Sequence, residues 1–566
     1  MQYSNDMYRP AKQIFSLILL LIGSFCSCKN KHQLNNTDEV VNPSEMNEAV
    51  KVNIENIIAA AEKNKYKLKD SSSLTYYAFL KDYYNDTDYK PLWCGEQQWL
   101  PQADLLLNFI ENSSLQGLYK EDYHFEKLKK IKSILDTDSI KKTDAVLWAN
   151  ADVLMSEAFA GLLKDLRQGR LLPDSLSWKN DTTKFRIFFA PTFDRVKNGE
   201  QVNNILEEVQ PQHAGYKSLK KTIQNFTDSM DTRTYTYLIY PNKDSVGFLK
   251  LFKKRMAESG IIISANADSL QLNTAIRQYQ KMKGITVDGK IGNSVIKKLN
   301  LTDKQKFNTI AITLDKYKLL PEVMPSKYIW VNLPAYYLKV WSADTIALES
   351  KIICGKPNTP TPILTSAISD LVLYPTWTVP ASIISKDMLP GLKRSTSYLA
   401  RKGLYLLNGK GEKINPANIN WAKYTKGIPF RIQQGSGDGN ALGVIKFNFQ
   451  NPYSVYLHDT NQRYLFKNSV RSLSHGCVRV QEWQKLANFI IRNDSINLNK
   501  NDIMNYNTDS IINWIAHKEK HTIEVKNKIP LFIRYFSCEN INGSIKFYDD
   551  IYGEDKDLKQ KFFAGK

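Results

Sequence analysis

A histidine and a cysteine in the C-terminal part of the chain lie at a spacing that could support nucleophilic catalysis. Sixteen residues separate His458 from His475, and Cys477 follows inside the run Ser474-His475-Gly476-Cys477. A cysteine thiol with its ordinary pKa of about 8.5 is mostly protonated at neutral pH, whereas the thiolate is the nucleophile. A nearby imidazole can take that proton. We therefore predict that Cys477 is a nucleophile and that His458 is its base.

The neighbours of Cys477 suit acyl transfer. Gly476 lets the backbone approach a reacting carbonyl closely, and the N–H groups of Gly476 and Cys477 are natural donors to an oxyanion. Arg479 could fork onto a substrate carboxylate, although a structural ion pair is an alternative role. His475 is equally compatible with a contact in an active site and with a structural hydrogen bond.

A third group must orient the imidazole of His458. On a strand that ends at His458, Tyr456 and His458 face one side, while Val455 and Leu457 face the core. Asp459 adjoins the histidine, but on a strand its side chain should point away. A backbone carbonyl is therefore the alternative partner of the imidazole.

Two other interpretations compete with catalysis. Cys477 could be a buried, inert thiol, but its polar neighbours argue against an apolar core. His458, His475 and Cys477 could instead bind zinc, but no fourth ligand or ligand-spaced pair is evident. We predict neither a metal nor another cofactor.

The hydrophobic pattern that must position these residues changes to a period of two at Lys327. Residues 328–333 and 336–341 are aromatic and β-branched and flank Pro334-Ala335, which predicts a β-hairpin. Residues 381–427 are long and irregular, and such insertions in a compact domain are often lids. Further strands are predicted at 371–377, 429–433, 453–458, 530–536 and 544–548, with a helix at 508–518.

The N-terminal half has helical patterns. Apolar residues recur at helical spacing in 102–113 and in 143–165. The stretch between Tyr76 and Trp99 is dense in aromatic residues, which indicates packing, with a carbohydrate platform as the alternative.

Residues 245–300 form a small unit of their own. Leu272, Ala275, Ile276 and Tyr279 share one helix face. Gly284 can end that helix as a left-handed cap, and a second helix carries Val295, Ile296 and Leu299.

Composition narrows the class of protein. The chain has 566 residues, of which 42% are hydrophobic and 24% charged, as in globular proteins. It has no run of 18 apolar residues, which excludes a polytopic membrane protein. The net charge of +20 favours anionic surroundings, but the positive charge is dispersed and no motif that reads nucleic acid is present. We predict no nucleic-acid partner.

The first 28 residues indicate export. Arg9 and Lys12 precede the apolar run from Ile14 to Phe25, which fits a secretory signal. Cys28 follows a small residue, as at bacterial lipoprotein processing sites, so we predict lipidation of Cys28. Ordinary cleavage and an uncleaved anchor are the alternatives. The predicted location is the periplasm, with a lipid anchor in a membrane and a flexible tether at 29–50.

Four cysteines follow the signal, at positions 94, 354, 477 and 538. If Cys477 stays free, at most one disulfide can form among the other three.

The chain resembles the L,D-transpeptidases of bacterial cell walls. That family is marked by a histidine, a gap of similar length and the sequence [Ser/Thr]-His-Gly-Cys, which His458 and residues 474–477 match. Residues 359–383, 386–392, 428–443 and 456–460 resemble the large multidomain branch of the family. Residues 89–110 and 163–176 resemble its helical scaffold domain, and residues 272–299 resemble a small three-helix peptidoglycan-binding domain.

The resemblance implies a multidomain α+β protein. The implied parts are a helical scaffold domain (51–244), a peptidoglycan-binding domain (245–300), a linker helix (301–326), a mainly-β catalytic domain of β-sandwich type (327–500) with a capping insertion (381–427), and a C-terminal α/β extension (501–566).

The implied activity is a two-step acyl transfer. Cys477 attacks the carbonyl of the third residue, a diamino acid, of a tetrapeptide stem, and D-Ala leaves with His458 as its acid. The thioester then passes to the side-chain amine of a second stem, which forms a 3→3 cross-link. The implied partners are peptidoglycan stem peptides, and carbapenems are expected to acylate the thiolate. The implied substrate contacts are Trp377, Tyr456, Ser474, His475 and Arg479.

Other outcomes of the same thioester stay open. Water could hydrolyse it, which would make an L,D-carboxypeptidase, or a protein amine could capture it, which would attach a protein to the wall. A non-catalytic peptidoglycan-binding lipoprotein is an alternative of another class, and the intact pair of His458 and Cys477 argues against it.

Overall fold

The structure is a computed structural model that describes residues 39–172, 182–496 and 506–565. The predicted signal, Cys28 and the tether up to residue 38 lie outside the described residues. Among the described residues, one helix, Ala145–Gln168, is long and apolar enough to cross a membrane, but 83% of its apolar window is buried inside the protein. Its burial identifies it as a core helix.

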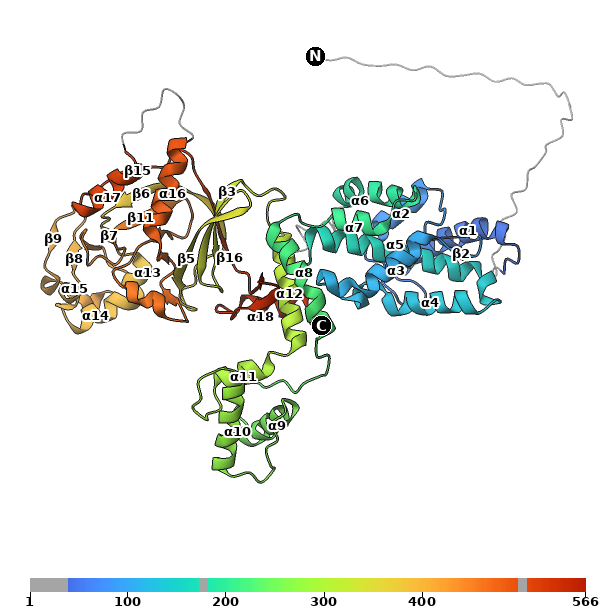
Figure 1. Cartoon of the computed structure of the whole chain (residues 1–566), viewed down its shortest axis with the longest axis horizontal. Helices are drawn as coiled ribbons and strands as arrows, with labels where there is room; N and C mark the ends of the chain where they lie inside the picture. The colour runs from blue at the N-terminus through green and yellow to red at the C-terminus, as the bar shows by residue number, and fades with distance from the viewer. Residues whose placement is uncertain (1–38, 173–181, 497–505, 566) are drawn as a thin grey trace, which may run out of the picture.

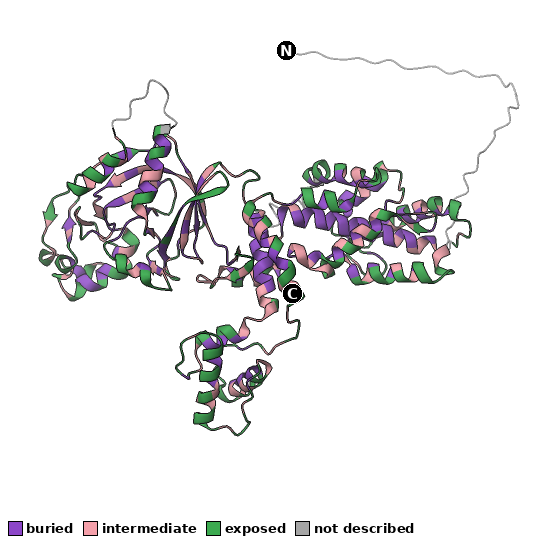
Figure 2. Ribbon diagram, viewed as in Figure 1, coloured by how far each residue is buried: buried purple, intermediate pink, exposed green. Residues whose placement is uncertain are grey.

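The N-terminal domain is a helical bundle around that core helix, α5 (Ala145–Gln168). Asp144 caps α5 by accepting a hydrogen bond from the Leu147 N–H group, and burial continues along nearly its whole length (Figure 2). The predicted helices at 102–113 and 143–165 are confirmed as α3 and α5. Around α5 lie α1 (Pro43–Lys63), α2 (Tyr77–Asp86), α3 (Pro101–Glu111), α4 (Phe125–Thr137), α6 (Thr182–Lys197) and α7 (Val202–Glu208), with a short hairpin of β1 (Cys94–Gly95) and β2 (Gln98–Trp99).

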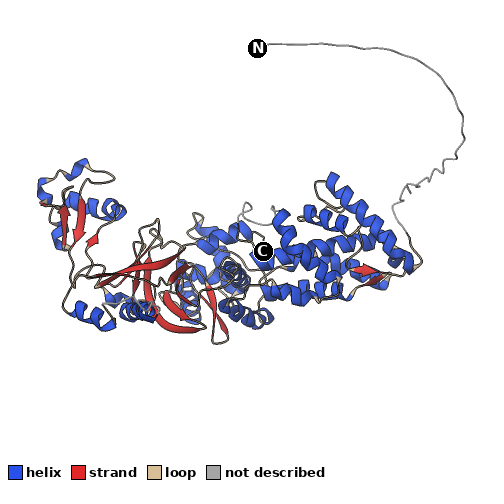
Figure 3. Ribbon diagram, turned by 90° about the horizontal axis from the view of Figure 1, so that it is seen from above, coloured by secondary structure: helices blue, strands red, loops and turns tan. Residues whose placement is uncertain are grey.

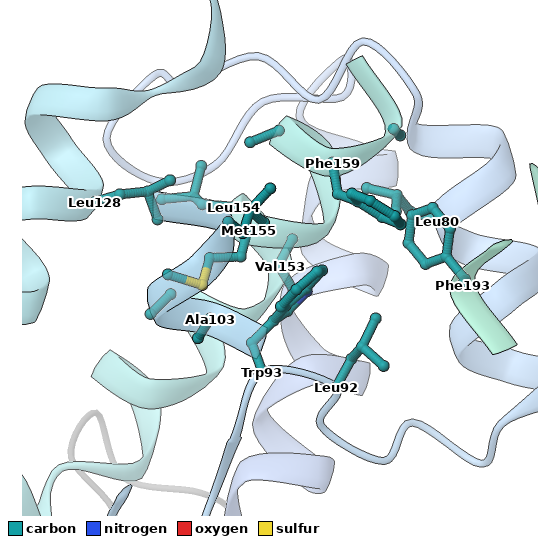
Figure 4. Packing of buried hydrophobic residues seen from close by; sticks show 14 of the residues in the cluster. Leu80, Leu92, Trp93, Ala103, Leu128, Val153, Leu154, Met155, Phe159 and Phe193 are labelled. Carbon is teal, nitrogen blue, oxygen red and sulfur yellow. The ribbon is translucent and has the colours of Figure 1, made fainter. Parts of the chain in front are cut away.

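The aromatic stretch of this domain serves packing. Trp93 and Tyr84 are fully buried, and the rings of Trp93 and Phe159 meet edge to face at 5.5 Å (Figure 4). Asp152, also buried, accepts hydrogen bonds from the backbone of Leu92 and Trp93 and from the Tyr84 hydroxyl. The buried carboxylate of Asp152 at the centre of the bundle therefore has its hydrogen-bond donors.

A small three-helix domain hangs below the rest of the molecule in Figure 1. It consists of α9 (Ser245–Glu258), α10 (Ser269–Met282) and α11 (Asn293–Asn300). Phe252, Ile276, Tyr279 and Leu299 meet in its own core. The predicted helical face of α10 is confirmed, and Gly284 takes a left-handed φ of 63° after it.

Two helices, α8 (Ala214–Asp228) and α12 (Asp303–Tyr317), lie between the scaffold and the β domain (Figure 1). The C-terminal elements β17 (Cys538–Ile541), β18 (Ser544–Phe547) and α18 (Glu554–Phe562) pack against them. Lys316 of α12 is buried and donates to Asp555 of α18 at 2.8 Å and to the Tyr535 carbonyl at 2.7 Å. The C-terminal elements therefore connect the β domain to the helices α8 and α12.

The β domain is built on one sheet of ten strands that closes on itself. The strands follow the order β11-β12-β14-β5-β4-β3-β16-β6-β15, β13 pairs with β5, and β11 also pairs with β6. Their bounds are β3 (Lys327–Asn332), β4 (Tyr337–Ser342), β5 (Thr345–Gly355), β6 (Leu364–Leu373), β11 (Ile445–Phe449), β12 (Leu457–His458), β13 (Ser472–Ser474), β14 (Val478–Val480), β15 (Thr522–Glu524) and β16 (Pro530–Arg534). Helices α16 (Trp483–Ile496) and α17 (Thr508–Ala516) complete the domain.

The sheet confirms the predicted hairpin and corrects three boundaries. The strand predicted at 371–377 ends at Leu373, because Tyr374 has a φ of 46°. The strand predicted at 453–458 is reduced to β12, because Ser454 has a φ of 56°. The predicted boundary at residue 500 divides one sheet, because β16 pairs with both β3 and β6.

The predicted capping insertion is an ordered lobe, which we call the cap lobe, residues 377–434. In Figure 3 it stands at the end of the molecule opposite the scaffold. Leu392, Leu406, Trp421 and Ile432 form its own core. Its elements are β7 (Trp377–Thr378), α13 (Ala381–Ile383), η5 (Ile384–Met388), α14 (Leu389–Arg394), α15 (Tyr398–Arg401), β8 (Leu404–Leu407), β9 (Lys413–Ile414) and β10 (Arg431–Gln434).

Candidate active site

A cavity of about 320 Å³ lies between the closed sheet and the cap lobe. Every side chain that the sequence assigns to the site lines it: Trp377, Tyr456, His458, Ser474, His475, Cys477 and Arg479. The parallel pairing of β12 with β14 explains the convergence, because it sets His458 opposite Arg479 and Leu457 opposite Val478. Leu457 and Val478 are buried in the core of the sheet, so the alternate residues face the cavity.

The imidazole of His458 is oriented by a backbone carbonyl. Its Nδ1 atom lies 2.5 Å from the Asp459 carbonyl oxygen, and because a carbonyl only accepts, the proton sits on Nδ1. Burial, together with the positive charge of Arg479, lowers the pKa of His458 to about 3. His458 is therefore a neutral imidazole, and with the proton on Nδ1 its Nε2 carries the lone pair that can accept a proton.

Asp459 has a different role from the one its position suggests. Its carboxylate is fully buried, pairs with Arg463 at 2.5 Å and accepts a hydrogen bond from the Val444 N–H group. A Cβ on Gly443 would meet that carboxylate at 2.2 Å. Asp459 therefore fixes the loop before β11, while its carbonyl holds His458.

Cys477 is the one described cysteine whose side chain lines this cavity. All four described cysteines are free, and the other three are buried. Burial raises the pKa of the Cys477 thiol, while Tyr456, Lys446 and Arg479 act in the opposite direction. The thiol is therefore protonated at rest and must lose its proton as the sulfur attacks.

The hydroxyl of Ser474 braces the loop that carries Cys477. It donates to the Cys477 carbonyl at 2.6 Å and accepts from the Gly476 N–H group at 3.1 Å. Gly476 has a φ of 119°, which a side chain would strain. Of the two predicted oxyanion donors, the Gly476 N–H group is thus already bonded to Ser474. The Cys477 N–H group donates to no acceptor in the described part of the protein.

Arg479 is a half-buried cation at the wall of the cavity. Its Nη1 donates to Gln462 at 3.1 Å, whereas its Nε has no partner in the described part of the protein. Burial lowers the pKa of Arg479 below its ordinary value. No carboxylate within the described ranges pairs with it, so the predicted structural ion pair is not found, and the group is available to a ligand anion.

His475 connects the nucleophile loop to the cap lobe. Its Nε2 lies 2.5 Å from the carboxylate of Asp387 in η5. His475 therefore lines the cavity and also makes a structural contact, and both of its predicted roles are compatible with its position.

Sequence reasoning missed two functional neighbours. Asp387 lies 88 positions from its partner, and no local pattern reveals that pairing. Lys446 pairs in register with His458, and its ammonium lies 4.1 Å from the centre of the Tyr456 ring. Alternation along 445–449 could have identified Lys446 as a residue on the polar face.

Within the ranges that the structure describes, no group of three or more His, Cys, Asp or Glu side chains is placed to hold a metal ion. The zinc alternative therefore gains no support from the geometry.

The family comparisons agree with this site. Residues 326–498 match the family described as the L,D-transpeptidase catalytic domain, and residues 78–223 match the family described as the scaffold domain. The chain therefore contains an L,D-transpeptidase catalytic domain joined to a scaffold domain. The multidomain α+β fold class is confirmed.

Individual relatives share modest sequence identity with this chain. A Haemophilus influenzae protein provisionally named an L,D-transpeptidase is 31% identical over 263 residues, which are 46% of this chain and 50% of the relative. The chain thus spans about half the length of that curated relative. Solved L,D-transpeptidases from Mycobacterium smegmatis (11% identity, 37% of this chain and 58% of that chain, TM-score 0.17) and Stackebrandtia nassauensis (14%, 42% and 81%, TM-score 0.15) are also similar.

Proposed function

We propose that this protein is a cell-wall L,D-transpeptidase that forms 3→3 cross-links between peptidoglycan stems through a thioester on Cys477. The observation that carries the proposal is one cavity that holds three groups: a thiol, a neutral imidazole with its proton on Nδ1, and a half-buried guanidinium that no carboxylate of the described residues pairs with. These are a nucleophile, a base and an anchor for a carboxylate.

The first half-reaction releases D-Ala. His458 Nε2 takes the Cys477 proton as the sulfur bonds to the carbonyl carbon of the diamino acid. The tetrahedral oxyanion forms near the Cys477 N–H group. When the carbon–nitrogen bond to D-Ala breaks, His458 returns the proton to the leaving amine and a thioester remains.

The second half-reaction forms the cross-link. The side-chain amine of an acceptor stem attacks the thioester and gives a proton to His458. The carbon–sulfur bond then breaks, and His458 reprotonates Cys477. Arg479 would hold a carboxylate of the bound stem, while Trp377 and Tyr456 form walls of the cavity.

The chain would act in the periplasm, held to a membrane by lipid on Cys28. A Cys28→Ala variant expressed in a bacterial host should move from the membrane fraction to the soluble fraction. Retention in the membrane fraction would contradict the anchor and would favour an uncleaved signal.

The activity is tested with the full-length chain, purified in detergent, and tetrapeptide muropeptides. Mass spectrometry should detect released D-Ala and a dimer that has lost one D-Ala, and both should be absent with Cys477→Ala. Arg479→Gln should lower kcat/KM for the muropeptide about a hundredfold through a lost charged hydrogen bond. Tripeptide without dimer would identify a carboxypeptidase, and no D-Ala release would contradict the proposal.

A further inference from the structure

Tyr456 is held on three sides beside the catalytic sulfur. Its ring meets the imidazole of His458 edge to face, with the ring centres 5.6 Å apart. Its hydroxyl forms a hydrogen bond with the Cys477 sulfur and accepts one from the indole of Trp377 in the cap lobe. The ammonium of Lys446 lies over the ring, 4.1 Å from its centre. Burial raises the pKa of the Tyr456 hydroxyl, which therefore stays protonated and donates to the sulfur.

The sheet fixes Lys446 in this position. Ile445 and Phe447, its neighbours along β11, are buried in the core of the sheet. Lys446 therefore faces the side that carries His458, its partner in register. It is not among the residues that line the catalytic cavity, whereas Tyr456 is. Lys446 thus lies behind the tyrosine as seen from the cavity, and its effect on the reaction must pass through that ring or through its charge.

The ammonium of Lys446 has no carboxylate partner. It is half-buried, and within the described ranges it forms neither an ion pair nor a side-chain hydrogen bond. Burial lowers its pKa, and the negative charges that oppose this shift are those of Cys477, first, and Asp370. The Asp370 carboxylate already accepts hydrogen bonds from Asn448 and Ser369. A partly buried charge without a partner costs stability, and the thiolate of Cys477 is the anion that offsets this cost.

Lys446 and Arg479 act on different members of the catalytic pair. Burial raises the pKa of the Cys477 thiol, and the groups that lower it are Tyr456, Lys446 and Arg479, in that order of strength. Burial lowers the pKa of His458, and there Arg479 contributes more than Lys446. Of the two cations, Lys446 therefore acts mainly on the thiol, and Arg479 mainly keeps the imidazole neutral.

We propose that Lys446 is a positioning residue for the nucleophile. Its ammonium holds the Tyr456 ring so that the hydroxyl meets the Cys477 sulfur, and its charge stabilises the thiolate. The inference rests on the proposed function, in which that sulfur attacks the stem peptide, and it adds a residue from behind the cavity wall. His475, the other imidazole of the cavity, already contacts Asp387. Removal of Lys446 should therefore change the thiol without disturbing that contact.

The test is the pH dependence of Cys477 alkylation by iodoacetamide in the full-length chain, in detergent, with the label located by peptide mass spectrometry. Lys446→Met should slow alkylation at pH 7 about tenfold and move the rate profile to higher pH. Lys446→Arg keeps a cation over the ring and should restore most of the rate. The matched control is Lys339→Met, which removes an ammonium 4.2 Å from the centre of the Tyr337 ring on β4 and should change nothing.

Two further measurements separate a positioning role from a merely structural one. Lys446→Met should not lower the melting temperature, because it removes a partly buried charge that no carboxylate compensates. In a Tyr456→Phe background, Lys446→Met should slow alkylation less than it does in the wild-type background, because the hydroxyl that the ammonium positions is gone.

An unchanged profile in Lys446→Met, with or without a lower melting temperature, would overturn the proposal. So would a loss in Lys446→Arg as large as in Lys446→Met, or an equal effect of Lys446→Met in both backgrounds. These readouts concern the thiol alone, and release of D-Ala from muropeptides by the wild type tests the proposed function separately. A shifted profile without that release would support the role of Lys446 and contradict the transpeptidase, and release with an unshifted profile would do the reverse.

Discussion

The imidazole of His475 and the carboxylate of Asp387 join the nucleophile loop to the cap lobe, with Nε2 2.5 Å from Oδ2. His475 stands two residues before Cys477, and Asp387 belongs to η5 of the cap lobe. The contact therefore ties the lobe to the rim of the catalytic cavity, and its two side chains remain partly exposed.

Breaking this contact should loosen the cap lobe without unfolding the protein. A contact between polar side chains that are this exposed contributes about 1 kcal/mol or less, so Asp387→Asn should leave the melting temperature nearly unchanged. Limited proteolysis within 381–427 should become several-fold faster. Asp344→Asn, at a turn of the β domain outside the cap lobe, is the control. Equal cleavage of wild type and Asp387→Asn would show that the contact does not hold the lobe.

The buried imidazole of His458 should make folding stability depend on pH. Its pKa is about 3 in the folded protein, against an ordinary value of 6.5. The unfolded chain therefore binds the extra proton between these values, and stability is lost as the pH falls below 6.5. At pH 5 the loss from this group is about 2 kcal/mol. His458→Gln should remove that part of the loss.

Denaturant unfolding at pH 7.5 and pH 5 measures the difference. His517→Gln, at an exposed histidine after α17, is the matched control and should keep the wild-type dependence. An unchanged pH dependence in His458→Gln would contradict the neutral, buried imidazole.

The Tyr456 hydroxyl should stabilise the thiolate of Cys477. Burial raises the pKa of the thiol, and hydrogen bonds from Tyr456 oppose that shift. Removal of one hydrogen bond to a charged group costs about 1.5 kcal/mol or more. Tyr456→Phe should therefore slow alkylation of Cys477 by iodoacetamide at pH 7 about tenfold and move the rate profile to higher pH. Tyr453→Phe, at the rim of the same cavity, should not. Equal profiles would exclude this role for Tyr456.

The sequence motif was sufficient to predict the reactive groups of the site but not the residues that hold those groups in position. His458 and Arg479 lie on the adjacent strands β12 and β14, and Cys477 directly precedes β14, so alternation and spacing locate all three. The cap lobe contributes Asp387 through tertiary packing, which no local pattern encodes. The sequence left the partner of His458 open between the side chain of Asp459 and a carbonyl. Only the geometry assigns the carbonyl to the imidazole and the carboxylate to Arg463.

Local sequence patterns also predicted only part of the fold. Periodicity predicted α3, α5, α10 and the first hairpin, because each repeats its pattern over at least one full turn or strand. It failed where single residues with positive φ, Tyr374 and Ser454, interrupt an apolar pattern. It also placed a boundary inside the sheet, because β16 pairs with β3 from 202 residues away and distant pairing leaves no local signal.

The most direct test of the central claim is intact-mass spectrometry of the full-length chain, in detergent, after incubation with a carbapenem. Wild type should gain the mass of one drug molecule. The gain should be absent in Cys477→Ala, slower in His458→Ala, and unchanged in Cys354→Ala, whose thiol is buried away from the cavity. A folded wild-type protein with a free Cys477 thiol and no adduct would contradict the proposed acylating nucleophile.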